Sequence, residues 1–273
     1  MIKRLKIYLG KALGIIAVIF TFVPEDMLKV YKLLPQVSDE VNIIFNRGLI
    51  FGGVLLLTMV CSCIYRKCRK HIDINGKNYN IRIQEKDLFK MKDCKKVIPF
   101  DECFTTKVGD APDETNPRSI CGQYIAKCPI QDQEIQNLIN TARLQPANTR
   151  SKYQNKIRYE SGKVIQKNDY LLMAFAKLDE NGSGVITRKE YIDCLEQLWI
   201  DIDKYYGQRD VCIPILGSGV TRMEDTSLTQ QELLDIMIES YKLSTHKIKA
   251  PYKLYIVYKK RDDFSLDKIR ESI

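Results

Sequence analysis

The sequence has few of the residues from which common catalytic and metal sites are built. It contains two histidines, His71 and His246, and none of its nine cysteines forms a paired CxxC element beside a histidine. Such a chain does not offer a zinc site of the usual cysteine and histidine spacing. GxSxG and HExxH motifs are both absent, so the signatures of serine hydrolases and zinc proteases are missing as well.

The common nucleotide fingerprints are also missing. No Gly-Lys-Ser/Thr segment forms a Walker A loop, and no GxGxxG pattern of dinucleotide-binding domains occurs. An odd number of cysteines gives no complete disulfide framework, so reduced thiols in the cytoplasm are the simplest interpretation. We therefore expect no metal and no resident cofactor. The fractions of 45% hydrophobic and 28% charged residues remain ordinary for a folded globular protein.

Positive charge is unevenly distributed along the 273 residues. The whole chain carries +9, with 43 basic against 34 acidic side chains. Residues 1–70 hold 11 basic and 4 acidic side chains, whereas residues 71–273 hold 32 and 30. Because the larger part is nearly neutral, the basic composition does not predict nucleic-acid binding, and we expect no nucleic-acid partner.

The excess charge flanks two apolar runs. Residues 12–23 and 48–65 are uncharged, and the second run has 18 residues. A span of about 30 Å of hydrocarbon needs roughly 20 residues at about 1.5 Å each. With their neighbours, the two runs predict transmembrane spans at about 5–23 and 46–65. A signal peptide or a buried core helix are the alternatives for the first run, but no small-residue cleavage site follows it.

The flanking charges predict an orientation for this hairpin. Basic residues precede the first span and follow the second, while the connecting residues 24–46 carry a net charge of −2. Positive segments stay in the cytoplasm. The domains expected are therefore a hairpin with basic flanks at 1–70 and a cytoplasmic domain at 71–273. The protein would be located in the bacterial inner membrane with both termini in the cytoplasm, and the lipid bilayer would be a partner.

The larger part alternates between strand and helix patterns. Strands are predicted at residues 78–84, 95–100, 162–166, 170–178, 210–216 and 254–258. Helices are predicted at 118–127, 133–143, 188–205 and 227–243, the last opened by a capping box at 227–230. Residues 145–161 are predicted to be a polar loop. This order indicates an α/β fold with a mixed sheet between helices.

The most informative segment is Ile213-Pro-Ile-Leu-Gly-Ser-Gly-Val-Thr-Arg222. A buried strand leads directly into a glycine loop that carries hydroxyl groups and an arginine. Glycines allow a phosphate to approach the backbone, and consecutive N–H groups form an anion-binding nest. Ligands bind at the carboxyl ends of strands in open α/β sheets. A plain turn is the competing interpretation.

This loop and three earlier segments, at 86–89, 97–104 and 119–124, together resemble a divergent macro domain. More closely, the chain resembles the macro-like module that follows two transmembrane helices in bacterial anti-phage Thoeris effectors. The resemblance covers essentially the whole chain and implies binding of an ADP-ribose derivative. It departs from ADP-ribose-hydrolysing members, because the first loop lacks their glycine run and no Asn–Asn–Gly cluster occurs at 100–104. Ligand sensing is therefore favoured over catalysis.

The resemblance also implies which residues bind the ligand. Asp87 would contact adenine, and the segment that contains Ser119 and Gly122 would form the first phosphate loop. The remaining implied positions lie after the 95–100 strand and in the glycine loop: Phe100, Asp101, Gly217, Ser218, Gly219, Val220, Thr221 and Arg222. Turn capping and ordinary surface polarity are the competing roles for Asp87, Ser119 and Arg222.

A separate motif suggests calcium. Residues 179–190 fit the EF-hand loop pattern, with oxygen ligands expected from Asp179, Asn181, Ser183 and Glu190. EF-hands normally pair, however, and no second loop exists in this chain. The alternative role of the segment is a turn between a strand and a helix, with Thr187 as the helix N-cap.

The sequence therefore predicts a non-enzymatic, membrane-anchored anti-phage effector. By the resemblance, a TIR-domain partner makes the nucleotide signal from NAD, and the signal leads to homo-oligomers that disrupt the membrane. Two alternatives stay open: a membrane-tethered ADP-ribosyl hydrolase or nucleotide-processing enzyme, and a calcium-responsive membrane protein.

Overall fold

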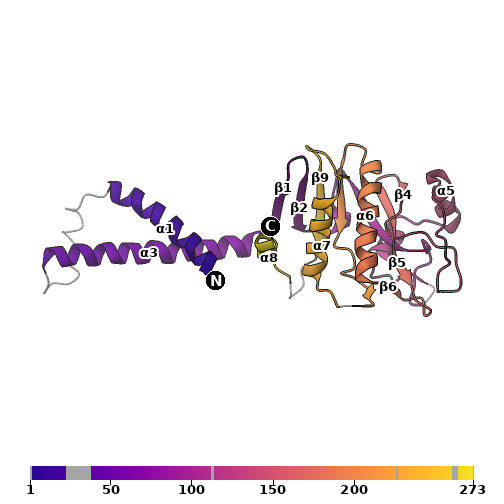
Figure 1. Ribbon diagram of the computed structural model, residues 1–273, viewed down its shortest axis with the longest axis horizontal. Helices are drawn as coiled ribbons and strands as arrows, with labels where there is room; N and C mark the ends of the chain where they lie inside the picture. Colours follow the sequence, from indigo (N-terminus) through magenta and orange to yellow (C-terminus); the bar gives the residue numbers. More distant parts are fainter. Residues whose placement is uncertain (1, 23–37, 112–113, 226, 260–263, 273) are drawn as a thin grey trace. The chain divides into compact units, whose positions relative to one another are not determined.

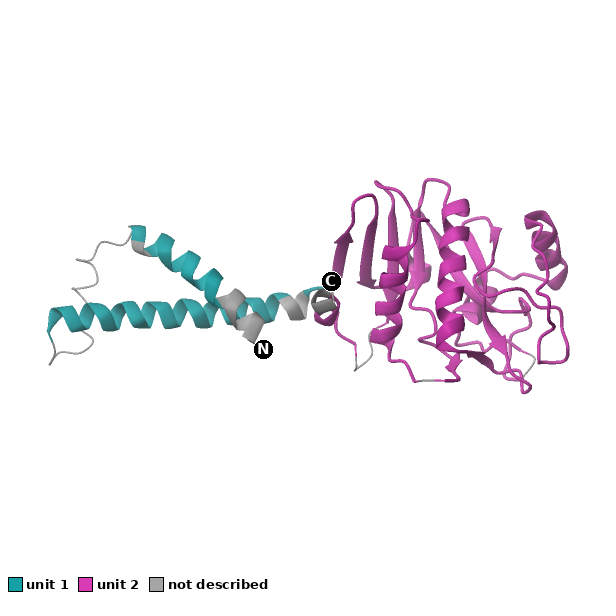
Figure 2. Ribbon diagram, viewed as in Figure 1, with its two compact units in different colours: residues 1–69 teal, residues 70–273 magenta. Residues whose placement is uncertain are grey.

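The structure, a computed structural model, describes residues 2–22, 38–111, 114–225, 227–259 and 264–272 (Figure 1). The chain divides into two compact units, Met1–Arg69 and Lys70–Ile273, which are coloured separately in Figure 2. The first unit consists of helices. The second contains the whole sheet and is described by itself below.

The first unit contains helices α1 (Ile2–Phe22) and α3 (Asp39–Cys68). Among the described residues, one stretch, Asp39–Tyr65, is long and apolar enough to cross a membrane. The apolar part of α1, Leu9–Ile19, is shorter than a span requires. The second predicted run is therefore helical with sufficient length, whereas a two-span hairpin remains a prediction.

The predicted connection between the two apolar runs, residues 24–46, is too long at its C-terminal end. Residues 39–46 belong to α3, which begins with Asp39 and Glu40 in its first turn. Carboxylates are favourable there because they face the positive end of the helix dipole. In the rest of the predicted connection, residues 24–37 lie outside the described residues and Ser38 is described.

The second unit is built on one mixed sheet flanked by helices. In chain order its elements are β1 (His71–Asn75), β2 (Asn80–Glu85), the 3₁₀ helix η1 (Leu88–Lys90), β3 (Cys94–Asp101), α4 (Ile120–Lys127), α5 (Asp132–Ala142), β4 (Val164–Lys167), β5 (Tyr170–Leu178), β6 (Gly184–Ile186), α6 (Arg188–Tyr205), β7 (Asp210–Pro214), β8 (Arg222–Met223), α7 (Gln230–Leu243), β9 (Lys253–Tyr258) and α8 (Leu266–Ser272). The described strands form a nine-stranded sheet in the order β1-β2-β9-β7-β3-β5-β6-β8, with β4 paired to β5.

The central strands are apolar on both faces because both faces are covered. In β5, Leu171 and Met173 join the core under α6 and α7, while Leu172 and Ala174 join the core under α4 and α5. Consecutive side chains of a strand point to opposite faces, so an uninterrupted apolar run is what a doubly covered strand needs. The α/β class with a mixed sheet between helices is thereby confirmed.

Most predicted elements are present, with shifts at their ends. Strand β5 and helix α6 have the predicted bounds. Helix α7 begins later than predicted, because Thr229 and Glu232 form its capping box rather than residues 227–230. The strand β1 was not predicted at all. It pairs with β2 through a short turn, in the register His71↔Gln84 to Asn75↔Asn80.

The topology brings five strand ends to one edge. Strands β2, β9, β7, β3 and β5 are neighbours and all run parallel to one another. Their carboxyl ends therefore share one side of the sheet, which is where ligands bind in open α/β folds.

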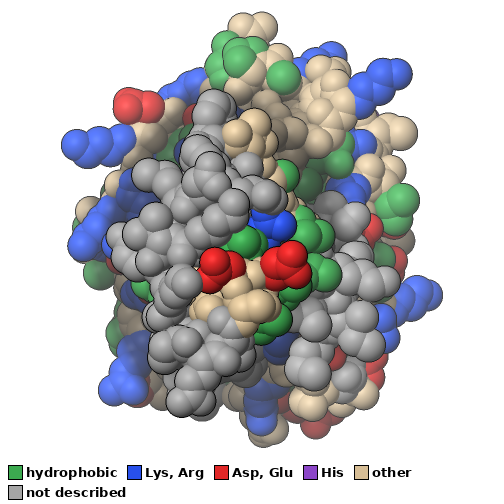
Figure 3. All heavy atoms as spheres, turned by 90° about the vertical axis from the view of Figure 1, so that its left-hand side faces the viewer, with side chains coloured by type: hydrophobic (Ala, Val, Ile, Leu, Met, Phe, Trp, Pro, Cys, Tyr) green, Lys and Arg blue, Asp and Glu red, His purple; other side chains and the backbone are tan. Residues whose placement is uncertain are grey.

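The charges on one face of the molecule are dispersed. Figure 3 shows Lys and Arg side chains distributed around the margin of that face, with acidic side chains among and between them.

Candidate functional site

A cleft follows the carboxyl ends of the five parallel strands. It consists of two cavities, of about 400 Å³ and about 220 Å³, in the size range of small-molecule sites. The two cavities adjoin one another, because they share six lining residues: Arg118, Ile120, Pro214, Ile215, Ser218 and Gly219. The cleft thus extends from the segment after β2, across the glycine loop, to the turn after β5.

The glycine loop forms one wall of the cleft. Gly217 has a φ of +74°, a conformation that side-chain-bearing residues rarely adopt. Ser218 is used internally, since its Oγ donates to the Ile215 carbonyl at 2.7 Å. The loop amides without an acceptor among the described residues are those of Gly217, Gly219, Val220 and Thr221. Such successive N–H groups form a site for an anion.

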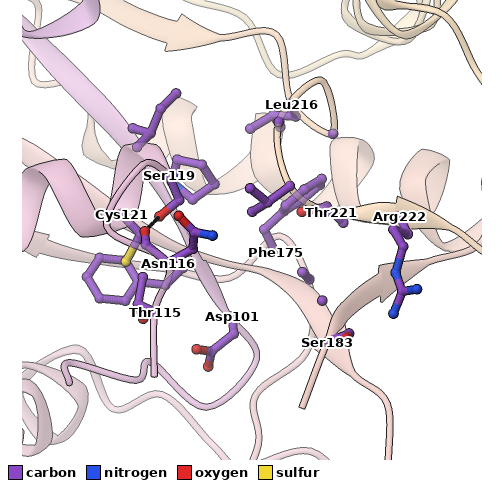
Figure 4. A pocket seen from close by; sticks show the side chains of 18 of the residues that line it. Asp101, Thr115, Asn116, Ser119, Cys121, Phe175, Ser183, Leu216, Thr221 and Arg222 are labelled. Carbon is purple, nitrogen blue, oxygen red and sulfur yellow. Dashed lines mark hydrogen bonds between the residues drawn. The ribbon is translucent and has the colours of Figure 1, made fainter. Parts of the chain in front are cut away.

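The beginning of α4 forms the opposite wall (Figure 4). Ser119 is the N-cap: its Oγ accepts from the Gly122 N–H at 2.9 Å and donates to the Asn116 carbonyl at 2.7 Å. The hydroxyl is therefore committed to the cap. The amino end of α4 faces the cleft. Unpaired N–H groups and the helix dipole favour negative charge there. Arg118, one residue earlier, lines both cavities.

Asp87 lies at the end of the cleft beyond β2. Its Oδ1 accepts from the Phe89 N–H at 2.8 Å and caps η1. Its other oxygen, Oδ2, has no hydrogen-bond partner among the residues that the structure describes. Phe89 lines the same cavity, so a carboxylate oxygen and an aromatic ring are available together. These groups suit a heterocyclic base that carries an N–H donor.

Asp101 lies near the other end, at the end of β3. One of its oxygens accepts from the Cys103 N–H at 2.7 Å and from the Thr105 N–H at 3.3 Å. Burial raises the pKa of this carboxyl group, and those hydrogen bonds oppose the rise only in part. Figure 4 shows Asp101 in the same part of the cleft as Thr115 and Asn116. Neither Thr115 nor Asn116 is predicted as a ligand residue from the sequence.

Two of the predicted ligand residues also have a role in the packing of the protein interior. Gly122 does not line either cavity, and a Cβ there would meet the Asn116 carbonyl oxygen at 2.3 Å. The glycine is therefore required by packing of α4 against the preceding loop. Phe100 borders the cleft but is 2% exposed, with its ring packed against Phe104 and Tyr124. Its side chain belongs mainly to the core.

The EF-hand-like segment forms a turn at the mouth of the cleft. Oδ1 of Asp179 accepts from the N–H groups of Asn181 at 2.9 Å and Ser183 at 2.8 Å. Glu190 accepts from Lys177 Nζ at 2.5 Å and closes a capping box with Thr187. An ammonium group at a proposed calcium ligand opposes a divalent cation. The segment before it is the strand β5 rather than a helix, so the contacts favour the strand-to-helix turn.

Several residues of the cleft gave no sequence signal. The sequence predicts Arg118 only as the beginning of a helix, and Gly182 and Ser183 only as part of the EF-hand pattern. Gly182 and Ser183 line the cleft because β5 ends beside β3 and because β6 pairs with β8 directly after the glycine loop. Arg118 lines it because it directly precedes the N-cap of α4. A contact between segments so distant in the chain is not visible in local spacing.

Fold and cleft together define a macro domain: a mixed sheet between helices, with a ligand cleft at the carboxyl ends of its parallel strands. The profile of the macro domain of Thoeris protein ThsA matches residues 81–259. The chain belongs to this family. It is 29% identical over 222 residues to Thoeris protein ThsA of Bacillus amyloliquefaciens (strain Y2), which covers 78% of this chain and 74% of that protein.

Solved macrodomains are more distant. A mutant of the Oceanobacillus iheyensis macrodomain is 12% identical with a TM-score of 0.49, over 75% of this chain and all of that one. The macrodomain of Thermus aquaticus DarG is 10% identical with a TM-score of 0.39, over 66% and 97% of the two chains. The family assignment is based on the sequence match.

Proposed function

We propose that this protein is a membrane-anchored anti-phage effector whose macro domain binds an ADP-ribose-derived nucleotide signal. The observation that carries the proposal is the cleft, in which free amides of the glycine loop face the amino end of α4. Two groups of N–H donors on opposite walls suit a diphosphate. Membership of the Thoeris ThsA macro family supports the defence role.

The ligand would lie along the cleft. Its base would occupy the cavity of Asp87 and Phe89, and its diphosphate would lie between Gly219 and Arg118. The remaining part would reach the cavity of Asp101 and Asn116. These are the polar groups available at each position. The ligand is sensed rather than converted in this proposal.

The membrane-bound part would act as the effector. We propose that α1 and α3 cross the inner membrane as a hairpin, with both termini in the cytoplasm. A TIR-domain enzyme would supply the signal from NAD. Binding would favour oligomers whose hairpins rearrange and disrupt the membrane, which requires the signal to bind the oligomeric state more tightly than the resting state.

Calorimetry of the full chain in detergent tests the sensing step. We expect saturable binding of ADP-ribose or its conjugates and no binding of NAD-derived nicotinamide. A Gly219→Val variant should lose binding, while Gly48→Val, far away in the sequence in α3, should keep it. Failure of every ADP-ribose conjugate to bind would contradict the proposal. Release of free ADP-ribose from an ADP-ribosylated substrate would instead support the hydrolase alternative.

The hairpin is tested separately. Reporter fusions that are active only in the cytoplasm should be active at both termini, and cysteines placed near residue 30 should react with an impermeant thiol reagent from outside. A cytoplasmic reporter active at only one terminus would indicate a single span, and the α3 segment Asp39–Tyr65 would then be that span.

A further inference from the structure

Helices α6 and α7 form a second concave surface, away from the cleft. The two helices lie side by side on one face of the sheet (Figure 1). A groove of about 680 Å³ runs between their outer faces. Its apolar lining consists of Ile192, Ile200, Ile236 and Leu243, and Leu243 is 83% exposed. We call this surface the α6/α7 groove.

The rim of the α6/α7 groove is acidic. Glu196, Asp235 and Glu239 line it, and no Lys or Arg does so among the described residues. Glu239 pairs with Lys242, whose Nζ lies 2.8 Å from its carboxylate oxygen. Burial, together with the nearby carboxylates of Glu239 and Glu232, raises the pKa of Asp235. The three carboxylates of the groove therefore outnumber the lysine that pairs with one of them.

A loop with basic residues and one exposed apolar side chain lies in another part of the same unit, and its properties are complementary to those of the α6/α7 groove. Residues 150–157, which we call the basic loop, present Ile157 with 49% of its surface exposed. Arg150 and Lys152 are exposed in the same loop, and Lys156 is half-buried over the Tyr153 ring. An isolated apolar side chain among cations is the counterpart of an apolar groove with an acidic rim.

Hydrogen bonds to the buried Glu102 and within the loop itself hold the basic loop in one conformation. Ser151 Oγ donates to the buried Glu102 carboxylate at 2.5 Å, and the Ser151 N–H donates to the Lys156 carbonyl at 3.0 Å. Arg158, directly after the loop, lies 3.5 Å from the same carboxylate. Because these bonds order the loop in the free protein, little further conformational entropy is lost when it docks.

We propose that Ile157 of one chain inserts into the α6/α7 groove of a second copy, with Arg150 and Lys152 facing Glu196 and Asp235. No residue of the basic loop lines the groove of its own chain within the described residues. The contact is therefore between copies. It joins two different surfaces, so it is heterologous and generates a ring or a filament rather than a closed dimer.

This contact is independent of the nucleotide cleft, whose lining includes none of these residues. The proposal therefore holds or fails separately from ligand sensing. It also supplies a cytoplasmic route to homo-oligomers that does not depend on contacts between membrane helices.

Site-specific photo-crosslinking of the full chain in membranes tests the proposal. A photoreactive amino acid replaces Ile157, and a second sample carries it at Gln133, which is exposed on α5. We expect a dimer band with the label at 157 and not at 133. Mass spectrometry of mixed light and heavy chains should then join residue 157 of one copy to segments 192–200 or 235–246 of another.

Charge reversal provides the second measurement. Lys152→Glu and Glu196→Lys should each lower the crosslinking yield at least about fivefold, since either change places like charges across the contact. The double variant restores opposite charges and should recover most of the yield. Lys92→Glu, an exposed lysine outside the loop, is the matched control and should leave the yield unchanged.

The proposal is overturned by any of three results: no dimer with the label at 157, crosslinks to another protein or to a different surface of the second copy, or a double variant no better than the single ones. Because these side chains are exposed, unfolding is not the expected cause of a loss. The fluorescence of the single tryptophan, Trp199, which is buried in the domain core, confirms folding in each variant.

Discussion

Oδ2 of Asp179 lies 3.4 Å from Nη2 of Arg222, which links the turn after β5 to the end of the glycine loop. The same two segments are joined by the β6–β8 pairing, in which Val185 is opposite Arg222. The EF-hand-like segment and the glycine loop are therefore one structural unit at the mouth of the cleft. Arg222 is held at the rim by this unit, with its guanidinium group largely exposed to solvent.

The position of Arg222 leads to the first prediction. Arg222→Gln should weaken binding of ADP-ribose about tenfold if the proposed ligand lies beside this loop, because a charge-assisted hydrogen bond to its phosphate would be lost. Stability should change little, since an exposed ion pair contributes about 0–1 kcal/mol. Calorimetry and thermal unfolding of the same samples measure both effects. Equal affinity of Arg222→Gln and the natural protein would show that Arg222 does not contact the ligand.

The two loop glycines should respond differently to alanine. Gly217→Ala should lower the free energy of unfolding by about 1 kcal/mol, because φ is +74° there and alanine is strained in that region. Gly219→Ala should leave stability unchanged, since no atom lies within 4 Å of the added Cβ. Urea unfolding followed by Trp199 fluorescence distinguishes them. Equal losses at both positions would contradict the loop geometry.

The buried pair of Glu102 and Arg158 should matter for stability. Glu102 is 1% exposed, and Arg158→Met would leave its carboxylate buried without a cation. We expect a loss of about 3 kcal/mol in the free energy of unfolding, measured with urea. In a Glu102→Gln background the same change should cost clearly less. Additive losses would mean that the two side chains do not interact.

The raised pKa of Asp101 predicts a pH dependence. A carboxyl group whose pKa is higher in the folded than in the unfolded protein binds more protons when folded. Its contribution to stability is therefore largest below the ordinary pKa of 3.8 and is lost as pH rises through the folded pKa. Asp101→Asn keeps an oxygen for the Cys103 and Thr105 N–H groups but removes the titration.

Unfolding of the two proteins should be compared from pH 4 to pH 8. Relative to Asp101→Asn, the natural protein should lose stability as pH rises, and the difference should level off above the folded pKa. A difference that is constant over the whole range would show that Asp101 titrates at the same pH in the folded and unfolded chains.

Much of the fold could be predicted from local patterns. The apolar run of β5 and the 3.6-residue spacing of α6 set their bounds, because each pattern encodes which sides are buried. The short strands β6 and β8 could not be predicted, since three and two residues carry no periodicity and exist only through their pairing. Strand β1 is a different case, because His71–Asn75 alternates polar and apolar side chains and its alternate residues are buried, so its pattern was visible in the sequence.

The candidate site also has one part that the sequence predicts and another that depends on the tertiary structure. The sequence alone determined that a glycine loop follows a buried strand, because a strand, two glycines and an arginine are neighbours in the chain. Only the tertiary structure decided what faces that loop. Arg118 and Asn116 line the opposite wall, and Gly122 and Phe100 serve the core, because strand order and helix packing bring together residues about a hundred positions apart. Local spacing contains no record of such contacts, whereas the packing of side chains in three dimensions determines them.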